Sequence, residues 1–401
     1  MALDIFKEKG VPLSKQQFHW KELAGQPISK LNTDALSRVR IILMNGIEQQ
    51  QNRFLHHMAQ FNNGQLRVPL AQVRRVDHHQ QTLVNWLLPA DQSPLETTIA
   101  YEQVAIEVTA GIAQHEPDPY VKQALDFGLL EDFDHMYRYS ALMDRVEGKD
   151  ANNILQSYTD IIPGRPTMVE HRAPEDDVRR PYDKKKVHPL TRLHALTLVG
   201  GEYQTRDYYM NVGPTFSDPM ARMLYAEIAS IEEQHVTHYE SLCDPSESWM
   251  EKWLLYEACE VYNYLACANQ ETHPRLKAIW ERFVEYELGQ LHFAMEHFKK
   301  LEKRDPAEVL PQTLPEPFKY QSNRDYVRKV LKDQVHLRAV GTEFVDPAKV
   351  PESEATLQYR NTMNQHGSPT EIVAEGYVWR PGTELVMGRD VLPEINQGRL
   401  Q

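Results

Sequence analysis

Two sets of acidic and histidine residues recur in this chain at a constant separation of one hundred positions. Residues three apart on a helix lie on one face, so an acidic residue and a histidine at that spacing can bind one metal ion together. Carboxylates with one imidazole per metal suit iron or manganese, and the histidine spacing matches no zinc motif. The first set is Glu102, Asp132 and His135, and the second set is Glu202, Glu232 and His235.

Both acidic-x-x-His pairs lie on predicted helical seams, where apolar side chains are expected. Tyr225, Ile228, Glu232, His235, Tyr239 and Leu242 step by three and four, and the other seam runs from Leu125 through Asp132 and His135 to Leu142. A buried carboxylate costs several kcal/mol unless it is paired or binds metal. We therefore expect a dinuclear centre with all six residues as ligands and two iron ions, manganese or a mixed pair being alternatives. The plainer interpretation is a network of hydrogen-bonded core residues.

One tyrosine continues this seam beyond the histidine. Tyr239 follows His235 by four residues and repeats Tyr139 at the same separation of one hundred. We expect Tyr239 to lie beside the metal centre as a hydrogen-bond or redox partner. It is therefore the candidate catalytic residue.

The elements that must position these residues are long helices, because helical periodicity dominates residues 31–301. The prediction is an all-α fold in which short loops join consecutive helices into antiparallel hairpins. The stretch 147–189 is rich in proline and charge, and we interpret it as a crossover along a bundle, with a disordered linker as the alternative. The predicted helices span 33–61, 70–88, 95–115, 120–146, 190–210, 219–242, 248–269 and 274–303.

The segment 95–242 resembles the ferritin-like di-iron carboxylate proteins of the rubrerythrin kind. The resemblance rests on Gly-Gly-Glu-Tyr at 200–203 and Ile-Glu-Glu-Gln-His at 231–235, and it covers about 150 of the 401 residues. It implies a ferritin-like four-helix bundle in which Glu102 and Glu202 are single ligands and the two acidic-x-x-His pairs supply the others.

Two departures from the family pattern matter. Asp132 stands where the family has Glu, and its side chain is shorter by one methylene group. Whether it bridges the two metal ions is therefore left open, and the neighbouring Glu131 could substitute. No Cys-x-x-Cys occurs, so the chain lacks a rubredoxin-like module, and the electron donor must be an external partner.

The same spacing appears in the segments that flank the predicted bundle. It picks out Glu48, His78 and Gln81 before the bundle, and Glu257, Glu287 and Gln290 after it. Glutamine is a poor iron ligand, so we interpret these as related hairpins that kept a packing role. The alternative is a second metal site built from Glu48, His78, Glu257 and Glu287.

The chain is thus expected to divide into five parts around one metal-binding body. The final part holds many turn-forming residues and few apolar runs, which predicts a mostly irregular wrapping tail. The parts are an arm (1–30), a flanking hairpin (31–90), the bundle (91–246), a second flanking hairpin (247–304) and the tail (305–401).

Composition narrows the function classes further. The 57 acidic against 44 basic residues give a formal charge of -13, which argues against nucleic-acid binding. Residues 1–10 have no apolar leader, no segment is apolar enough to span a membrane, and three cysteines are too few for a disulfide framework. We expect a cytoplasmic protein without nucleic-acid or membrane partners. A homodimer is compatible with the sequence.

The sequence therefore predicts an oxidoreductase that activates dioxygen or hydrogen peroxide at a dinuclear iron centre. One alternative is a non-catalytic iron-binding protein for storage or sensing. A further alternative is a structural helical protein whose site is empty.

Overall fold

The computed structural model describes residues 3–61 and 64–379 of the chain. Within these residues the regular secondary structure is helical apart from a two-stranded antiparallel sheet and a bridge between Asp4 and Thr313, so the all-α prediction is confirmed. In that sheet β1 (Arg338–Val340) pairs with β2 (Glu343–Val345), and Ala339 lies opposite Phe344. No described helix is both long enough and apolar enough to span a membrane.

Eight long helices build the body of the molecule. All eight were predicted, and their ends differ from the predicted ends by no more than three residues. They are α2 (Ala35–Phe61), α3 (Arg67–Asn85), α4 (Pro94–Ala113), α5 (Pro119–Glu147), α8 (Pro189–Val212), α9 (Pro219–Glu240), α10 (Trp249–Gln270) and α11 (Pro274–Glu302).

Capping residues fix where these helices begin. The Ser93 side chain accepts a hydrogen bond from the Glu96 backbone, and Glu96 reaches back to the Ser93 backbone, which is a capping box at the start of α4. The side chains of Asp118 and Asp218 accept backbone hydrogen bonds at the starts of α5 and α9, and each is followed by a proline in the first helical turn. These short signals explain why the helix boundaries could be predicted closely.

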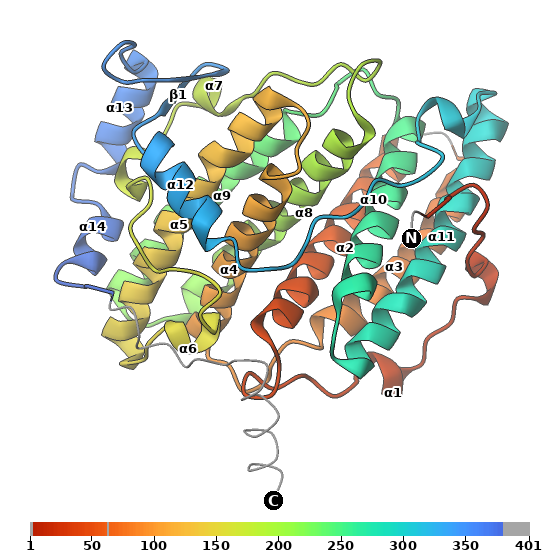
Figure 1. Ribbon diagram of the computed structural model, residues 1–401, viewed down its shortest axis with the longest axis horizontal. Helices are drawn as coiled ribbons and strands as arrows, with labels where there is room; N and C mark the ends of the chain where they lie inside the picture. The colour runs from red at the N-terminus through yellow and green to blue at the C-terminus, as the bar shows by residue number, and fades with distance from the viewer. Residues whose placement is uncertain (1–2, 62–63, 380–401) are drawn as a thin grey trace, which may run out of the picture.

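The eight helices form two groups of four that lie side by side (Figure 1). The first group comprises α4, α5, α8 and α9, and the second comprises α2, α3, α10 and α11. Helices α2 and α10 of the second group pack against α8 of the first. Two glycines permit this contact, because a Cβ atom added at Gly46 on α2 would lie 2.5 Å from the Gly200 oxygen on α8.

The crossover between α5 and α8 is partly buried and packs on the body of the molecule, unlike a loose linker. It contains α6 (Asn152–Leu155), the 3₁₀ turn η2 (Thr167–Val169) and α7 (Pro174–Asp177). Arg165 donates a hydrogen bond of 2.7 Å to the Phe127 carbonyl oxygen on α5, which anchors the segment to the first group. The structure therefore favours the crossover interpretation.

The two ends of the described chain wrap the body. The N-terminal arm carries η1 (Leu13–Lys15) and α1 (Trp20–Leu23), and Gln16 donates a hydrogen bond to the Tyr286 carbonyl oxygen on α11. The C-terminal tail contains α12 (Arg324–Gln334), α13 (Glu354–Met363) and α14 (Pro369–Ala374), joined by irregular stretches. Helices α12 and α14 pack on α5, and α14 also packs on α9. Residues 380–401 of the predicted tail lie outside the described residues.

Candidate metal centre

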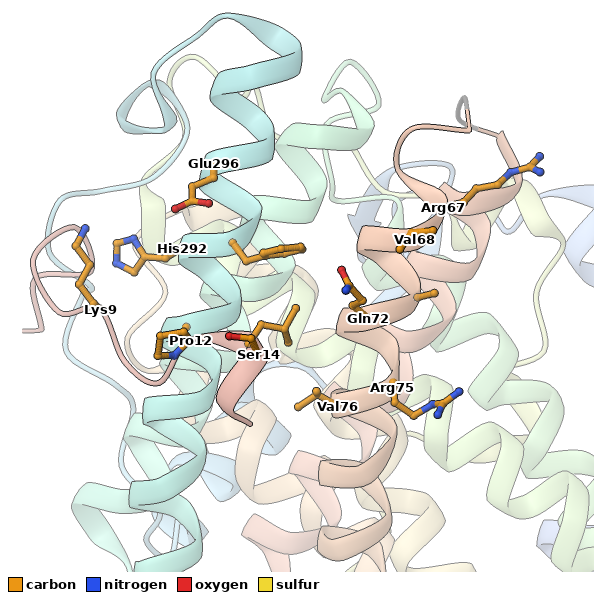
Figure 2. Close-up of a pocket in the computed structure, with 14 residues that line it drawn as sticks. Lys9, Pro12, Ser14, Arg67, Val68, Gln72, Arg75, Val76, His292 and Glu296 are labelled. Atoms are coloured by element: carbon orange, nitrogen blue, oxygen red, sulfur yellow. The ribbon is translucent and has the colours of Figure 1, made fainter. Parts of the chain in front are cut away.

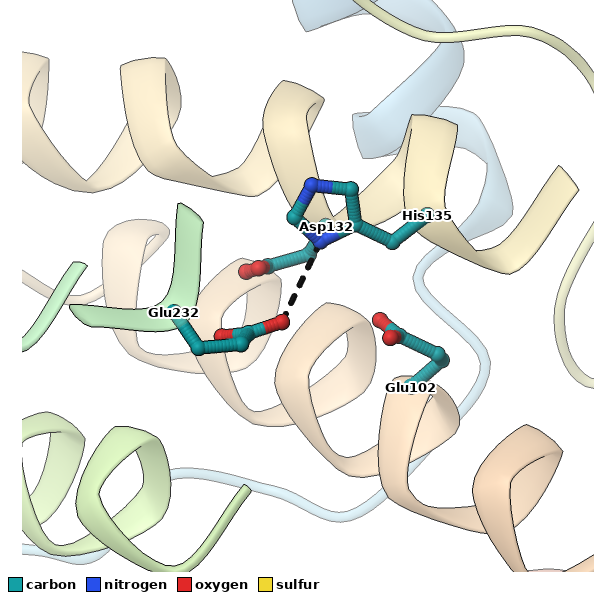
Figure 3. A group of neighbouring side chains, drawn as sticks. All are labelled: Glu102, Asp132, His135 and Glu232. Carbon is teal, nitrogen blue, oxygen red and sulfur yellow. Dashed lines mark hydrogen bonds and ion pairs between the residues drawn. The ribbon is translucent and has the colours of Figure 1, made fainter. Parts of the chain in front are cut away.

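The six predicted ligands converge between the four helices of the first group. Their donor atoms form two sets of four, and within each set the atoms all lie within 4.8 Å of one another. Asp132 and Glu232 belong to both sets, so the two sets are adjacent and share two carboxylates. Figure 3 shows the first set. The sets are Glu102, Asp132, His135 and Glu232, and Asp132, Glu202, Glu232 and His235.

Each helix contributes to the centre according to its place in the repeat. Helices α4 and α8 supply one glutamate each, while α5 and α9 each supply an acidic residue and the histidine one turn later. Five of the six side chains are fully buried, and Glu202 is 3 % exposed. The sequence repeat thus becomes an approximate twofold arrangement of donors in the core.

Both histidines direct the same ring nitrogen towards the carboxylates. Nδ1 of His135 lies 3.2 Å from Glu232 Oε1. Nδ1 of His235 lies 3.0 Å from Asp132 Oδ1 and 3.4 Å from Glu232 Oε2. The two rings are nearly parallel, with centroids 5.7 Å apart. Each half of the centre therefore offers one imidazole nitrogen with its carboxylates.

The opposite nitrogen of each histidine contacts a buried carboxylate outside the centre. His135 Nε2 lies 3.0 Å from Glu170 Oε2, and His235 Nε2 lies 2.9 Å from Glu131 Oε2. A carboxylate behind a histidine fixes the ring and its tautomer and makes the inward nitrogen a better metal ligand. Sequence reasoning missed Glu170, because the crossover carries no repeat or periodicity that would single it out.

The structure separates the roles of the neighbours Glu131 and Asp132. Glu131 forms an ion pair with Arg172, and Arg165 lies 3.7 Å from it. Although burial alone would raise the pKa of Glu131, Arg172 and then His235 bring it well below its ordinary value. Asp132 forms no ion pair with a lysine or arginine in the described part of the chain, and its Oδ1 faces Nδ1 of His235 inside the centre. Asp132, not Glu131, is thus placed to be the ligand.

Burial and mutual repulsion shift the pKa values of the carboxylates in the centre. Burial, followed by the charges of the neighbouring carboxylates, raises the pKa of Glu102 and of Glu202 well above the usual range. For Glu232 burial acts in the same direction, but the adjacent His135 and His235 rings lower its pKa to about 2. The cluster therefore needs positive charge, which either protons or metal ions can supply.

The donor set fits a pair of metal ions. One oxygen of Glu102, Glu202 and Glu232 and the Nδ1 atom of His235 are buried without a hydrogen-bond partner. Buried polar atoms without partners are uncommon in folded proteins, and each costs about 1–3 kcal/mol. Their convergence on shared space is what metal ligation would explain.

Buried tyrosines lie next to both halves of the centre. The Tyr239 ring lies 6.4 Å from the His235 ring, and its hydroxyl is buried without a hydrogen-bond partner. It fits against Gly128, where an added Cβ would lie 2.2 Å from the Tyr239 oxygen. Tyr209, which the sequence reasoning did not identify, donates a hydrogen bond to Glu102 Oε1. Tyr209 follows Glu202 by two helical turns, a spacing that could have indicated it.

The flanking residues chosen from the sequence need one correction. His78 is exposed and Gln81 is only half-buried, whereas Asp77 and Gln80 are fully buried. The separation from Glu48 is 29 positions to Asp77 and 30 to His78. Because a shift of one residue turns a helical side chain by about 100°, the assumed spacing selected the wrong face of α3. A second site that includes His78 is therefore wrong.

Two of the surface cavities have linings that include none of the six ligands. A cavity of about 810 Å³ lies between α3 and α11, with Lys9, Arg75 and Glu296 around it, and none of the six ligands lines it (Figure 2). Another, of about 510 Å³, is lined by Tyr203, the neighbour of Glu202, and by apolar residues of α8.

Neither a family model, nor a curated protein, nor a solved structure matches this chain. The geometry of the centre is therefore the basis on which a function can be proposed.

Proposed function

We propose that this chain is a ferritin-like dinuclear carboxylate protein, an oxidoreductase that activates dioxygen or hydrogen peroxide. The observation that carries the proposal is that Asp132 and Glu232 each belong to both four-residue sets. Membership of both sets would allow these two carboxylates to bind both ions of an adjacent pair. With one imidazole for each ion, the donor set suits iron, with manganese or a mixed pair as alternatives.

The side chains of the centre would have different roles in binding a pair of metal ions. Asp132 and Glu232 would bridge, Glu102 with His135 would complete one site, and Glu202 with His235 would complete the other. Glu170 and Glu131 hold the two histidines from behind, so that their Nδ1 atoms stay directed inward. A bound iron pair would supply electrons for the reduction of oxygen or peroxide.

The surroundings of the centre suit redox chemistry in a protected core. Four tyrosines, Tyr139, Tyr209, Tyr225 and Tyr239, are buried around it, and Tyr239 remains the candidate for a redox or proton-transfer role. The three cysteines do not form a pair that could bind a sulfur-ligated iron. Electrons would therefore come from an external donor.

Rapid mixing tests the proposal. The protein is loaded anaerobically with ferrous iron and mixed with oxygen or with hydrogen peroxide while the iron absorption is followed. The proposal predicts oxidation of two irons per chain, faster than that of free ferrous ion, and repeated turnover when a chemical reductant is added. Binding of two irons without faster oxidation would instead favour storage or sensing, and failure to bind iron would favour a structural protein.

A further inference from the structure

A second group of buried carboxylates lies in the other half of the molecule. All four helices α2, α3, α10 and α11 contribute, and no member of the group is more than 1 % exposed. The donor oxygens of Glu257, Glu260 and Glu287 all lie within 4.8 Å of one another. The full group, here called the second centre, is Glu48, Asp77, Glu257, Glu260 and Glu287.

The second centre repeats the pattern of the first with glutamine in place of histidine. Asp77 and Gln80 on α3, like Glu287 and Gln290 on α11, are separated by three residues as Asp132 and His135 are. Gln80 donates hydrogen bonds to Glu48 and Glu287. Gln290 donates to Gln80 Oε1 at 3.2 Å and to Glu287 Oε1 at 3.3 Å. All donors of the second centre are thus oxygen atoms.

Three of the glutamates are held by one oxygen and leave the other free. Tyr264 and Gln80 donate to Oε1 of Glu48, and Trp253 and Gln51 donate to Oε1 of Glu257. Oε1 of Glu287 likewise accepts hydrogen bonds, whereas Oε2 of each of the three is buried without a partner. Such an arrangement orients a carboxylate and reserves its second oxygen for a ligand.

Asp77 on α3 provides independent evidence that the second centre binds a ligand. It is fully buried, and neither of its oxygens has a hydrogen-bond partner. It lies one turn before Gln80, which contacts both Glu48 and Glu287, so its side chain faces the same space. Both oxygens of Glu260 are also without partners.

No lysine, arginine or histidine forms an ion pair with these five carboxylates in the part of the chain that the structure describes. Burial, then the charges of its neighbours, raises the pKa of Asp77 well above the usual range, and burial raises that of Glu287 to about 7. Without a cation the group must keep protons. A divalent cation would remove this cost, because it binds the free oxygens directly.

We infer that the second centre binds a hard divalent cation of the Mg²⁺, Mn²⁺ or Ca²⁺ class, separately from the first centre. The class follows from the donors, since carboxylate and carboxamide oxygens without imidazole or thiolate select hard cations. The ion would tie together α2, α3, α10 and α11. The inference is independent of the proposed function, because it uses none of the six residues of the first centre.

Equilibrium dialysis of the metal-free, full-length protein against Mn²⁺ tests this inference. Four chains are compared: the wild type, Asp77→Asn/Glu260→Gln, the first-centre variant Glu232→Ala, and the control Glu285→Gln, which changes an exposed carboxylate on α11. We expect Asp77→Asn/Glu260→Gln to lose at least one equivalent of Mn²⁺ relative to the wild type and the control. The Glu232→Ala variant should keep that equivalent.

A fluorescence measurement covers the case in which the double variant does not fold. Trp253 donates a 2.6 Å hydrogen bond to Glu257, so paramagnetic Mn²⁺ in the second centre should quench its emission. In the Glu232→Ala variant, Mn²⁺ should quench tryptophan fluorescence, and Trp253→Phe should remove most of that quenching. Equal Mn²⁺ binding by a folded Asp77→Asn/Glu260→Gln variant and the control, or no Trp253-dependent quenching, would overturn the inference.

Discussion

Nε2 of His135 lies 3.0 Å from Oε2 of Glu170, although Glu170 belongs to the crossover and not to any long helix. Both side chains are fully buried. Although burial opposes protonation, the Glu170 carboxylate and then Glu232 raise the pKa of His135 well above its ordinary value. The crossover therefore contributes a side chain to the candidate metal centre as well as connecting its two halves.

Removal of this carboxylate should weaken metal binding without abolishing it. We expect Glu170→Gln to lower the iron affinity of the first centre by about 10–100-fold, as is typical for partners of metal-bound histidines. Competition with a coloured chelator measures the affinity. Glu175→Gln, which changes an exposed residue of the same crossover, is the control. Equal affinities for the two variants would contradict the role given to Glu170.

Substitution of a carboxylate that belongs to both sets should reduce iron binding more than substitution of one that belongs to a single set. Because Glu232 belongs to both sets, Glu232→Ala should remove both irons, whereas Glu102→Ala should leave the other site able to bind. Iron analysis after anaerobic loading gives the stoichiometry. Glu233→Ala changes the exposed neighbour and should keep two irons. Retention of one tightly bound iron in Glu232→Ala would show that its carboxylate is not shared.

The packing of Tyr239 against Gly128 can be tested with two glycines. Gly128→Ala would bring a methyl group against the Tyr239 hydroxyl and should destabilise the fold by about 1–3 kcal/mol. Gly201→Ala meets open space and should be neutral or stabilise α8 by up to ~1 kcal/mol. Addition of Tyr239→Phe should recover part of the loss, because the ring carbon lies 3.1 Å from the new atom. Chemical denaturation measures all three, and no recovery would argue against this contact.

The proposed role of Tyr239 predicts a defect in rate and not in metal content. Tyr239→Phe should bind two irons as the wild type does but should be oxidised or turned over more slowly by oxygen or peroxide. Tyr139→Phe is a matched control, because the Tyr139 hydroxyl is also buried without a hydrogen-bond partner. Rapid mixing gives the rates. Equal rates for the three proteins would exclude Tyr239 from the reaction.

Docking of the tail on α4 should depend on pH through Glu107. Burial raises the pKa of Glu107 from 4.5 to about 7, while Thr159 and Asn323 donate hydrogen bonds to it. A raised carboxyl pKa stabilises the fold below the unfolded-state pKa, and this contribution is lost as pH rises. We expect a loss of about 3 kcal/mol between pH 4.5 and pH 7.

The Glu107→Gln variant isolates this contribution because glutamine does not titrate. Unfolding free energies of the wild type and the variant are measured across the same pH range. The unfolding free energy of the wild type, relative to that of the variant, should fall steadily as pH rises. A difference that is independent of pH would mean that Glu107 ionises normally in the folded protein.

Much of the fold could be predicted because its signals are local. Caps such as Ser93 and Asp218 and the periodicity of apolar residues define each long helix without reference to the rest of the chain. The six residues of the first centre were identifiable for a related reason. A repeat of chemically equivalent residues on a helical seam can be recognised from the sequence without knowledge of the tertiary structure.

Residues that act through tertiary contacts could not be found in this way. Glu170 lies in an irregular segment, and only folding brings it to His135. Asp77 was missed because the spacing of the repeat was carried over without allowing for one residue fewer between α2 and α3. In that case burial on α3, and not sequence separation, identifies the face that points inward.

The most direct test of the central claim is a crystal structure of the iron-loaded protein with anomalous diffraction data collected at the iron edge. We expect two iron peaks between α4, α5, α8 and α9, with Asp132 and Glu232 as shared ligands and Nδ1 of His135 and His235 bound to one iron each. A first centre that contains no iron, or one whose irons share neither Asp132 nor Glu232, would contradict it.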